Sequence, residues 1–398
     1  MIYVHVPFCR SFCTYCGFYS EVAPKCRRDG DERIQNRLFE EFGASLSAEI
    51  RERKQVIDRV LTSGGVNTLY LGGGTPSVMP LPVYETILAA LTGAGVETSF
   101  DEFTIEVNPE DIVEKGIPYV EGLLRLGVNR ISMGVQSFDD SLLKFMNRRH
   151  TAEDARKAYH ILESAGVENI SIDLIFGLEQ LSDDLWRQTI EKAFDVSSRG
   201  ALPPHISAYQ LSVEPGSMLE KLMSKGKWQE ASDELCEHQY GILCEALDRA
   251  GYNHYEISNF AQPGFEAKHN SAYWRHIPYI GLGPGAHSFV PADGCGEFER
   301  QWNKDDLKGY LQAGKAGDFS LVRGGERLTA EQIALEKVML GLRTSTGLQE
   351  ETLRGYCGSS AVDEAIASGH LIRIAGGYVR IPEDRFFISD SIILNIYG

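Results

Sequence analysis

The stretch IYVHVPFCRSFCTYC (residues 2–16) joins a β-branched apolar run to three cysteines, Cys9, Cys13 and Cys16, in the spacing C-x3-C-x2-C. The run predicts a buried strand, and the cysteines follow where that strand ends. Three thiolates are one fewer than a structural zinc site or an ordinary iron–sulfur cluster uses. We therefore interpret the triplet as the ligands of a [4Fe–4S] cluster that leaves one iron open to a small molecule.

Zinc, a disulfide or thiols packed in a core are the alternatives to a cluster. A zinc site would need a fourth ligand at a short spacing, but the next candidate is Cys26, in a polar stretch. Disulfide frameworks belong to small secreted chains, whereas this chain has 398 residues, eight cysteines and no secretory signal pattern. The remaining cysteines, Cys236, Cys244, Cys295 and Cys357, have no ligand-like spacing and are interpreted as buried or incidental thiols.

The composition favours a globular, cytoplasmic protein. At 43% hydrophobic residues the chain can bury a large core, and no stretch approaches the length of a membrane span. The formal net charge of −17 disfavours a general nucleic-acid or anionic-membrane surface. Cysteines without a secretory segment indicate a reducing compartment, in which a thiolate-bound cluster can persist.

Strand-like and helix-like segments alternate through the first half of the chain. Between the apolar runs lie segments of helical periodicity, so the pattern predicts an α/β fold with a parallel sheet covered by helices. Six repeats of this unit fit a barrel or an incomplete one. The predicted strands are residues 2–6, 67–73, 102–107, 129–135, 169–177 and 205–211.

Polar residues stand at the carboxyl end of each predicted strand, where parallel barrels carry their chemistry. After the cysteines of the first strand, the positions are Gly72 to Thr75, Glu106 with Asn108, Gln136, Asp173, and Tyr209 with Gln210. Asn108 could equally be a turn former. The set as a whole predicts one site at the C-terminal face of the sheet.

An open iron needs a chelator, and S-adenosylmethionine has an amino and a carboxylate group that can fill this role. Cleavage of its carbon–sulfur bond is chemistry that the cofactor supplies. Glycines 72–74 let the backbone approach the methionine end. Glu106 and Asp173 can accept hydrogen bonds from an ammonium or ribose hydroxyls, and Arg148 can pair with the carboxylate.

Six motifs, VHVPFCRSFCTYCGF, LYLGGGTPS, IEVNPED, NRISMGVQSF, DLIFGL and YEISNFA, resemble the radical S-adenosylmethionine proteins related to oxygen-independent coproporphyrinogen III dehydrogenase. The resemblance runs to about residue 290. It implies a partial (β/α)6 barrel with the cluster on the three cysteines, and it places Tyr15 near a second S-adenosylmethionine. The implied S-adenosylmethionine contacts are Tyr3, Gly73, Gly74, Thr75, Glu106, Gln136, Arg148 and Asp173.

Two departures from the dehydrogenase select a branch of this family. The dehydrogenase has a further cysteine two residues after the third, whereas this chain has Phe18. The chain also carries HNSAYW at residues 269–274, followed by YIGLGPGAHSF, and here it resembles the haem chaperone branch, HemW. The imidazole could ligate haem iron and the aromatic rings could pack on a macrocycle. The implied haem residues are His269, Asn270, Tyr273 and Trp274, with His287 as a second candidate.

The organisation changes beyond residue 290. Residues 291–328 are predicted to be a connector with one helix, and residues 329–398 a separate module of three helices followed by a hairpin at Gly376 and Gly377. Such a module suggests a winged-helix-like fold. From Thr329 onward nine Asp and Glu face six Lys and Arg, so DNA binding lacks its basic footprint. We expect the module to cover the barrel or to meet a partner protein.

Two functions follow from the resemblance. The first is a haem chaperone that binds haem and delivers it to a recipient such as a respiratory haem protein, without coproporphyrinogen dehydrogenase activity. The second is the dehydrogenase itself, which decarboxylates propionate side chains to vinyl groups. Phe18 and the HNSAYW motif favour the first. The sequence does not determine the haem recipient, the electron donor, whether haem is attached covalently, or whether S-adenosylmethionine is used in the cycle. It is also compatible with a homodimer.

Overall fold

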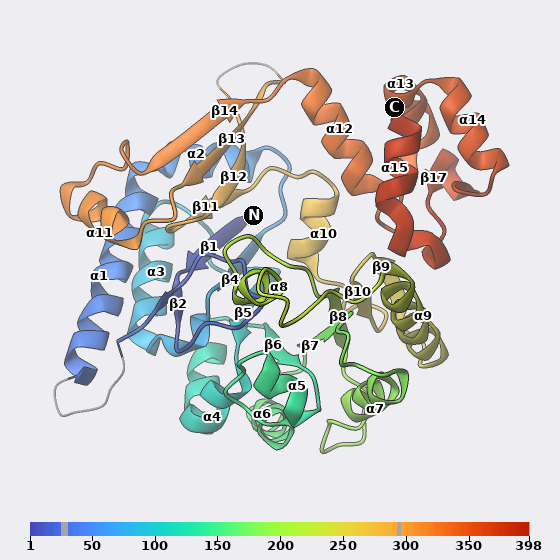
Figure 1. Ribbon diagram of the computed structural model, residues 1–398. Coiled ribbons are helices and arrows are strands. Elements are labelled where there is room, and N and C mark those ends of the chain that lie inside the picture. Colours follow the sequence, from blue (N-terminus) through green and yellow to red (C-terminus); the bar gives the residue numbers. More distant parts are fainter. Residues whose placement is uncertain (25–30, 293–295, 398) are drawn as a thin grey trace.

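The structure is a computed structural model that describes residues 1–24, 31–292 and 296–397 (Figure 1). Cys26 and Cys295 lie outside the described residues. Six parallel strands form the centre of a nine-stranded sheet, paired in chain order. They are β1 (Ile2–Val6), β4 (Thr68–Gly73), β5 (Glu102–Val107), β6 (Arg130–Gln136), β7 (Ile170–Phe176) and β8 (His205–Gln210). The predicted α/β fold of a partial barrel is confirmed.

Helices connect these strands and cover the outer face of the sheet (Figure 1). Their starts follow ordinary capping chemistry; Thr151, for example, forms a capping box with Asp154 at the start of α6. The covering helices are α1 (Asp31–Glu52), α2 (Lys54–Thr62), α3 (Leu81–Gly93), α4 (Pro109–Arg125), α5 (Asp140–Phe145), α6 (Ala152–Ser164), α7 (Asp183–Phe194) and α9 (Asp233–Arg249).

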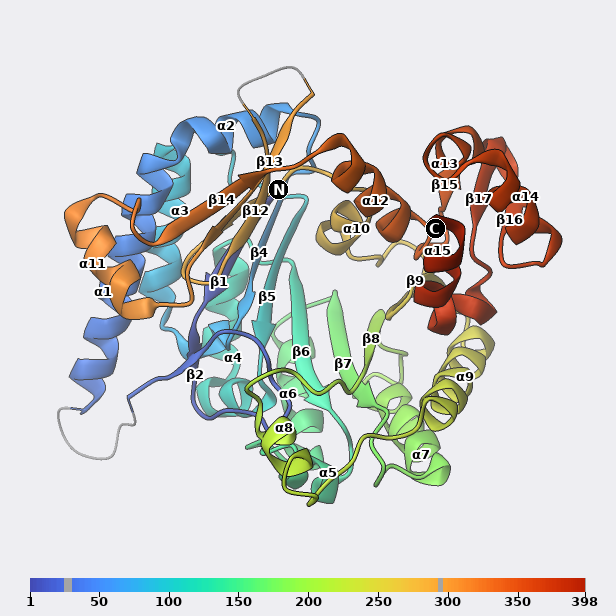
Figure 2. The same ribbon diagram turned by 45° about the horizontal axis from the view of Figure 1, so that its top comes forward.

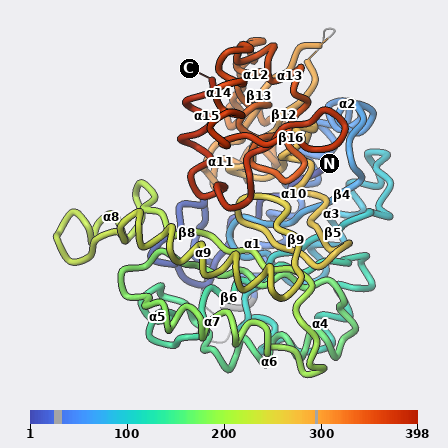
Figure 3. Tube along the Cα trace, turned by 90° about the vertical axis from the view of Figure 1, so that its right-hand side faces the viewer, coloured from blue at the N-terminus to red at the C-terminus, as the bar shows by residue number. Residues whose placement is uncertain are grey.

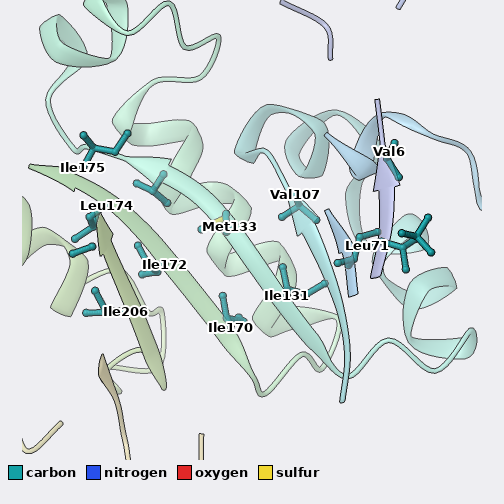
Figure 4. Close-up of a cluster of buried hydrophobic side chains, with 14 of the residues drawn as sticks. Val6, Leu71, Val107, Ile131, Met133, Ile170, Ile172, Leu174, Ile175 and Ile206 are labelled. Atoms are coloured by element: carbon teal, nitrogen blue, oxygen red, sulfur yellow. The ribbon is translucent and has the colours of Figure 1, made fainter. Parts of the chain in front are cut away.

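Alternate residues of each strand face opposite sides of the sheet, and the two sides differ in chemistry. One side is apolar and packs under the helices, with Val6, Val107, Met133 and Ile172 among its members (Figure 4). The other side is polar. It carries Tyr70 on β4, Thr104 and Glu106 on β5, Arg130 and Ser132 on β6, Ser171 and Asp173 on β7, and His205 and Ser207 on β8.

The sheet is wider than the six predicted strands. β11 (Ile280–Leu282) adds in parallel to β1, and β10 (Asn259–Ala261) with β9 (Asn253–Glu256) adds antiparallel strands beyond β8. β11 and β9 are the two outer strands of this sheet. The sheet therefore does not close on itself, and the barrel is incomplete.

Two segments stand at opposite ends of the barrel (Figure 2). The cysteine loop, with β2 (Phe8–Cys9), β3 (Glu21–Val22) and α8 (Met218–Met223), lies at the carboxyl ends of the strands. α10 (Lys268–Trp274) lies at their amino ends, because it bonds to Thr68 and Glu102, the first residues of β4 and β5. The two ends are called the cysteine end and the α10 end below.

The predicted connector contains its expected helix, α11 (Leu307–Ala316), together with two strands. These strands, β13 (Phe298–Asn303) and β14 (Arg323–Arg327), form an antiparallel sheet with β12 (His287–Pro291). The predicted boundary at residue 290 falls inside β12. Arg53 joins this part to the barrel by donating to the Gly281 carbonyl at 2.9 Å and to the Gln301 side chain at 2.7 Å.

The C-terminal module stands above the barrel (Figure 3). It has the three expected helices, α12 (Ala330–Gly341), α13 (Glu350–Cys357) and α14 (Ser359–Ala367), and the hairpin of β16 (Ile372–Ile374) and β17 (Tyr378–Arg380). β15 (Leu348–Gln349) and α15 (Ser389–Tyr397) complete it. Its winged-helix-like character stays a prediction. Within the described residues, no helix is both long and apolar enough to cross a bilayer.

Candidate functional site

A cavity of about 1390 Å³ occupies the barrel interior. It opens at the cysteine end and reaches Asn270 of α10. It brings together residues from all six parallel strands or the loops that follow them. Of the predicted site residues, the lining includes Cys9, Cys13, Tyr15, Cys16, Gly73, Gly74, Thr75, Glu106, Gln136, Arg148, Asp173 and Asn270.

Two of the three thiols belong to a hydrogen-bonded frame. The Cys13 thiol lies 3.5 Å from the Arg148 guanidinium, which also donates to Asn108 Oδ1 at 2.7 Å. Asn108 in turn donates to Thr75 Oγ1 at 3.1 Å, and this hydroxyl lies 3.5 Å from Cys9 Sγ. From the sequence, Asn108 could have been either a site residue or a turn former. In the structure it links Arg148, which contacts Cys13, to Thr75, which contacts Cys9.

Gly73 and Gly74 allow a close approach of backbone at the end of β4. Gly74 N–H donates to the Val6 carbonyl at 2.8 Å, and a Cβ at Gly74 would lie 2.7 Å from the Phe8 carbonyl oxygen. Gly73 has φ +107°, and a Cβ there would lie 2.5 Å from the His5 ring. A side chain at either position would push the cysteine loop away from the cavity.

Gln136 ends β6 with a left-handed backbone, φ 67°, where the pairing with β7 shifts register. A non-glycine residue in this conformation costs about 1 kcal/mol. Its amide lies over Gly134, where a Cβ would come within 2.8 Å of it and 3.2 Å of Arg148. The backbone turn thus aims the Gln136 side chain into the cavity.

Two partly buried carboxylates face the cavity below the cysteine loop. Glu106 accepts hydrogen bonds from Tyr70 O–H at 2.8 Å and from Gly73 N–H at 3.1 Å. Asp173 accepts from the Ser132 hydroxyl at 2.9 Å. Burial raises the pKa of Glu106 to about 7 and that of Asp173 to about 6. Both groups therefore exchange protons near neutral pH, as groups at binding sites often do.

Sequence reasoning missed the polar layer beneath these carboxylates. Tyr70, Arg130, Ser132 and Ser207 also line the cavity. Arg130 is only 1% exposed, and its Nε has no hydrogen-bond partner among the described residues. The available signal was the period of two in the strands, as in Arg130–Ser132–Gly134, which marks the inward face.

The structure places the HNSAYW residues mostly away from the cavity. His269 is 1% exposed, and both its ring nitrogens have partners: Thr68 Oγ1 at 2.8 Å and Tyr273 O–H at 3.3 Å. Burial lowers its pKa to about 3, so the ring is neutral. Among the described residues of the motif, Asn270 lines the cavity, whereas His269, Tyr273 and Trp274 do not.

The two tyrosines predicted as cofactor contacts differ in position. Tyr15 lines the cavity beside Cys13 and Arg148, and burial raises its pKa. Tyr3 is absent from the described lining; its hydroxyl instead hydrogen-bonds His5 Nδ1 at 3.0 Å. His5 also contacts the Tyr19 carbonyl at 2.8 Å, so Tyr3 supports the cysteine loop through His5.

The donor set fits an iron–sulfur cluster. The three thiols line one cavity, and they influence one another electrostatically. Burial raises the pKa of Cys16 to about 11, so the thiol stays protonated until a metal displaces the proton. Among the described residues, the three cysteines included, no group of three His, Cys, Asp or Glu side chains is placed to hold a single metal ion. Thiol donors of this kind suit iron–sulfur ligation.

A partial parallel barrel that opens on three cysteines is the architecture of a radical S-adenosylmethionine protein, and the Radical SAM superfamily profile matches residues 3–193. The haem chaperone HemW of Synechocystis sp. is 33% identical over 87% of this chain and 78% of its own length. The haem chaperone HemW of Lactococcus lactis is 32% identical over 88% of this chain and 83% of its own length. The chain therefore belongs to the HemW family of haem chaperones.

A solved structure supports the fold separately. Coproporphyrinogen III oxidase, HemN, from Escherichia coli superposes with a TM-score of 0.75, over 100% of this chain and 89% of that enzyme. The two sequences are 21% identical, so this likeness concerns the fold alone.

Proposed function

We propose that this protein binds haem and delivers it to haem-dependent proteins, such as respiratory enzymes, with a [4Fe–4S] cluster on Cys9, Cys13 and Cys16 and S-adenosylmethionine beside it. The observation that carries the proposal is the convergence of the three cysteines with the glycine, carboxylate and guanidinium groups on one cavity. Membership of the haem chaperone family supports haem as the cargo.

The chain's own residues divide the binding of S-adenosylmethionine between them. Gly73, Gly74 and Thr75 offer backbone at the methionine end, and Glu106 accepts from its ammonium group. Arg148 pairs with the carboxylate while it holds Cys13 and Asn108. Asp173 and Gln136 accept from or donate to the ribose. When bound, the cluster and S-adenosylmethionine supply one-electron chemistry that side chains cannot supply.

Haem ligation by His269 is also part of the proposal, but it requires α10 to move. Both ring nitrogens are engaged and the ring is buried. His269 can reach a haem iron only after α10 leaves the amino ends of β4 and β5. Asn270, Tyr273 and Trp274 would move with it, because all four residues belong to this one short helix.

The test uses anaerobically reconstituted full-length protein in two parallel assays. In the first, haemin is titrated into the protein and binding is followed by the Soret band; saturable binding at one site is expected. In the second, the protein is incubated with S-adenosylmethionine, reductant and coproporphyrinogen III. Formation of protoporphyrinogen at a catalytic rate would replace the proposed function by the dehydrogenase reaction, and absence of haemin binding would remove it.

A further inference from the structure

The rim of the cavity at the cysteine end exposes large apolar side chains. Phe12 is 54% exposed, Phe18 72%, Tyr209 43% and Met218 51%, and all four line the cavity. They come from the cysteine loop, the end of β8 and the start of α8. Four of the twelve exposed large apolar side chains in the described part of the chain thus gather on one opening. Gatherings of this kind mark binding surfaces.

The exposure of these side chains does not come from loose chain ends. The Phe12 carbonyl accepts from Asn147 Nδ2 at 2.6 Å, and Thr14 N–H donates to the Met146 carbonyl at 3.2 Å. On the other side, Leu219 N–H of α8 donates to the Thr14 carbonyl at 3.0 Å. The rim is therefore held by hydrogen bonds from the two residues that follow α5 and from α8, and its aromatic groups face solvent from a fixed frame.

Unpaired cations stand beside this apolar rim. Lys144, Arg149 and Lys221 are exposed and line the cavity, and in the described part of the chain they have no ion pair or hydrogen bond from their side chains. By contrast, Arg10 on the same lining is paired with Asp111 at 2.9 Å. In a chain of net charge −17, three free cations at one opening form a local attraction for anions.

Five carboxylates also line the cavity, but only Asp305 among them is exposed, against three exposed cations. Glu110 lies 3.4 Å from the His150 ring, and Glu214 accepts from the Ser212 hydroxyl at 2.8 Å. Glu106 and Asp173 lie deeper in the barrel, each bonded to a neighbouring hydroxyl. Asp305 is the exposed acid that remains on the described lining.

The size of the cavity leaves room for a second molecule. Ligand pockets are ordinarily about 300–1000 Å³, whereas this cavity measures about 1390 Å³. The inner groups assigned to a cofactor, Glu106 and Asp173 among them, make up only part of its lining. The outer part, with apolar side chains around the opening and cations at its edge, suits a flat apolar ligand that carries carboxylates.

We propose that haem docks at the mouth surface, defined as Phe12, Phe18, Tyr209 and Met218 with Lys144, Arg149 and Lys221. The macrocycle packs on the apolar side chains, and its two propionate carboxylates pair with the cations. This inference rests on the proposed function and names the place where the cargo first binds. It requires no movement of α10, and it gives Phe18 a direct contact with the cargo.

The test compares haemin affinity of reconstituted full-length variants, with cluster absorbance as the check on folding. Lys144→Glu combined with Arg149→Glu should weaken haemin binding about tenfold, and Phe18→Ser about fivefold. The matched controls are Arg51→Glu with Lys54→Glu, which make the same change in net charge on α1 and α2, and Leu321→Ser, which removes an exposed leucine. The haemin affinity of both controls should stay within twofold of that of the wild type.

Four results would overturn the mouth surface. If the mouth variants and controls bind haemin equally well, the proposed function stands and haem docks elsewhere. If only His269→Ala weakens binding, the HNSAYW helix is the docking site. If the mouth variants alter the oligomeric state in size-exclusion chromatography and not haemin affinity, the surface meets a protein. If the wild type binds no haemin, the proposed function fails together with the docking site.

Discussion

The cysteine end and the α10 end of the barrel cavity differ in how far the chain satisfies its own polar groups. At the α10 end, the Glu102 carboxylate accepts from the backbone N–H of Lys268 at 2.7 Å and of His269 at 2.9 Å, and Thr68 bonds the His269 ring. At the cysteine end, the lining carries exposed aromatic side chains and cations that have no partner in the described part of the chain. A closed end of this kind stabilises the fold, and an open end retains capacity to bind.

Tyr70 connects the two ends. Its ring lies 5.2 Å from the His269 ring, centre to centre, and its hydroxyl donates to Glu106 at 2.8 Å. His269, which closes the amino end of the barrel, is thus two contacts away from Glu106, a carboxylate of the proposed cofactor site. Any movement of α10 that frees His269 also removes packing from Tyr70. Variants at the cysteine end, at the α10 end and at the residues between them can therefore separate closure of the barrel by α10 from cofactor binding.

The largest effect is expected at the cysteine end, from Cys13→Ser. Loss of one of three thiolates should abolish the brown four-iron absorbance of the anaerobically reconstituted protein, because the remaining two cannot hold the cluster. Ultraviolet–visible spectra and iron content provide the measurement. Cys357→Ser, on α13, is the control and should retain both. A full four-iron spectrum in Cys13→Ser would show that the ligands have been assigned wrongly.

At the α10 end, Glu102→Ala should lower the free energy of unfolding by about 3 kcal/mol. The substitution leaves the buried N–H of His269 and the partly buried N–H of Lys268 without this acceptor, at a cost of about 1–3 kcal/mol for a buried group and less for the other. Urea unfolding of the cluster-free protein measures the change. Glu97→Ala, at an exposed position, should stay within about 0.5 kcal/mol. Equal stability of the two variants would mean that α10 does not depend on the Glu102 carboxylate.

Between the ends, S-adenosylmethionine affinity should rise about fivefold from pH 6 to pH 8. The pKa of Glu106 is raised by burial to about 7, so its carboxyl is mostly protonated at pH 6 and ionised at pH 8, when it can pair with an ammonium group. The charged and titratable groups that influence Glu106 include Tyr70, Asp173 and Arg130, with Cys16, Tyr3 and Tyr209 also interacting with it. Equilibrium dialysis across this range should give at most about a twofold rise for Glu106→Gln, because Asp173, with a pKa of about 6, still ionises in part. A fivefold rise that persists in this variant would assign the titration to another group.

The same raised pKa has an opposite consequence for the protein without ligand. The folded state holds the Glu106 proton more tightly than the unfolded state, in which the pKa is near 4.5. The contribution of Glu106 to stability is therefore greatest below pH 4.5 and declines as pH rises toward 7. Bound S-adenosylmethionine should offset this decline, because it pairs with the ionised carboxylate.

The smallest effect is expected from Tyr70→Phe. This substitution removes the hydroxyl that donates a hydrogen bond to Glu106, and it keeps the ring against His269. Loss of this hydrogen bond, about 1 kcal/mol, should weaken S-adenosylmethionine binding roughly fivefold at pH 7. It should also move the midpoint of the pH profile upward, because the bond favours the ionised carboxylate. Tyr84→Phe, buried between Pro76 and Tyr119, is the control for loss of a buried tyrosine hydroxyl. An unshifted midpoint in Tyr70→Phe would disconnect Tyr70 from the site.

By itself, the sequence determined the six parallel strands, since each shows an apolar run whose ends lie within one or two residues of the observed strand. It also indicated which residues meet at the carboxyl ends of those strands, because parallel strands bring their ends to one edge. The cysteine triplet and the residues Gly73, Glu106, Gln136 and Asp173 were all proposed in this way, and all line the cavity.

Only the tertiary structure decided what the local pattern does not contain. β11 has only three residues and forms a strand because it pairs with β1. A segment this short shows no hydrophobic periodicity from which it could be predicted. Asn108 joins Arg148 to Thr75 across 40 and 33 residues of sequence. His269, which the motif suggested as a ligand, is buried against Thr68, 201 residues away. Such contacts depend on how distant segments pack, and spacing along the chain carries no record of them.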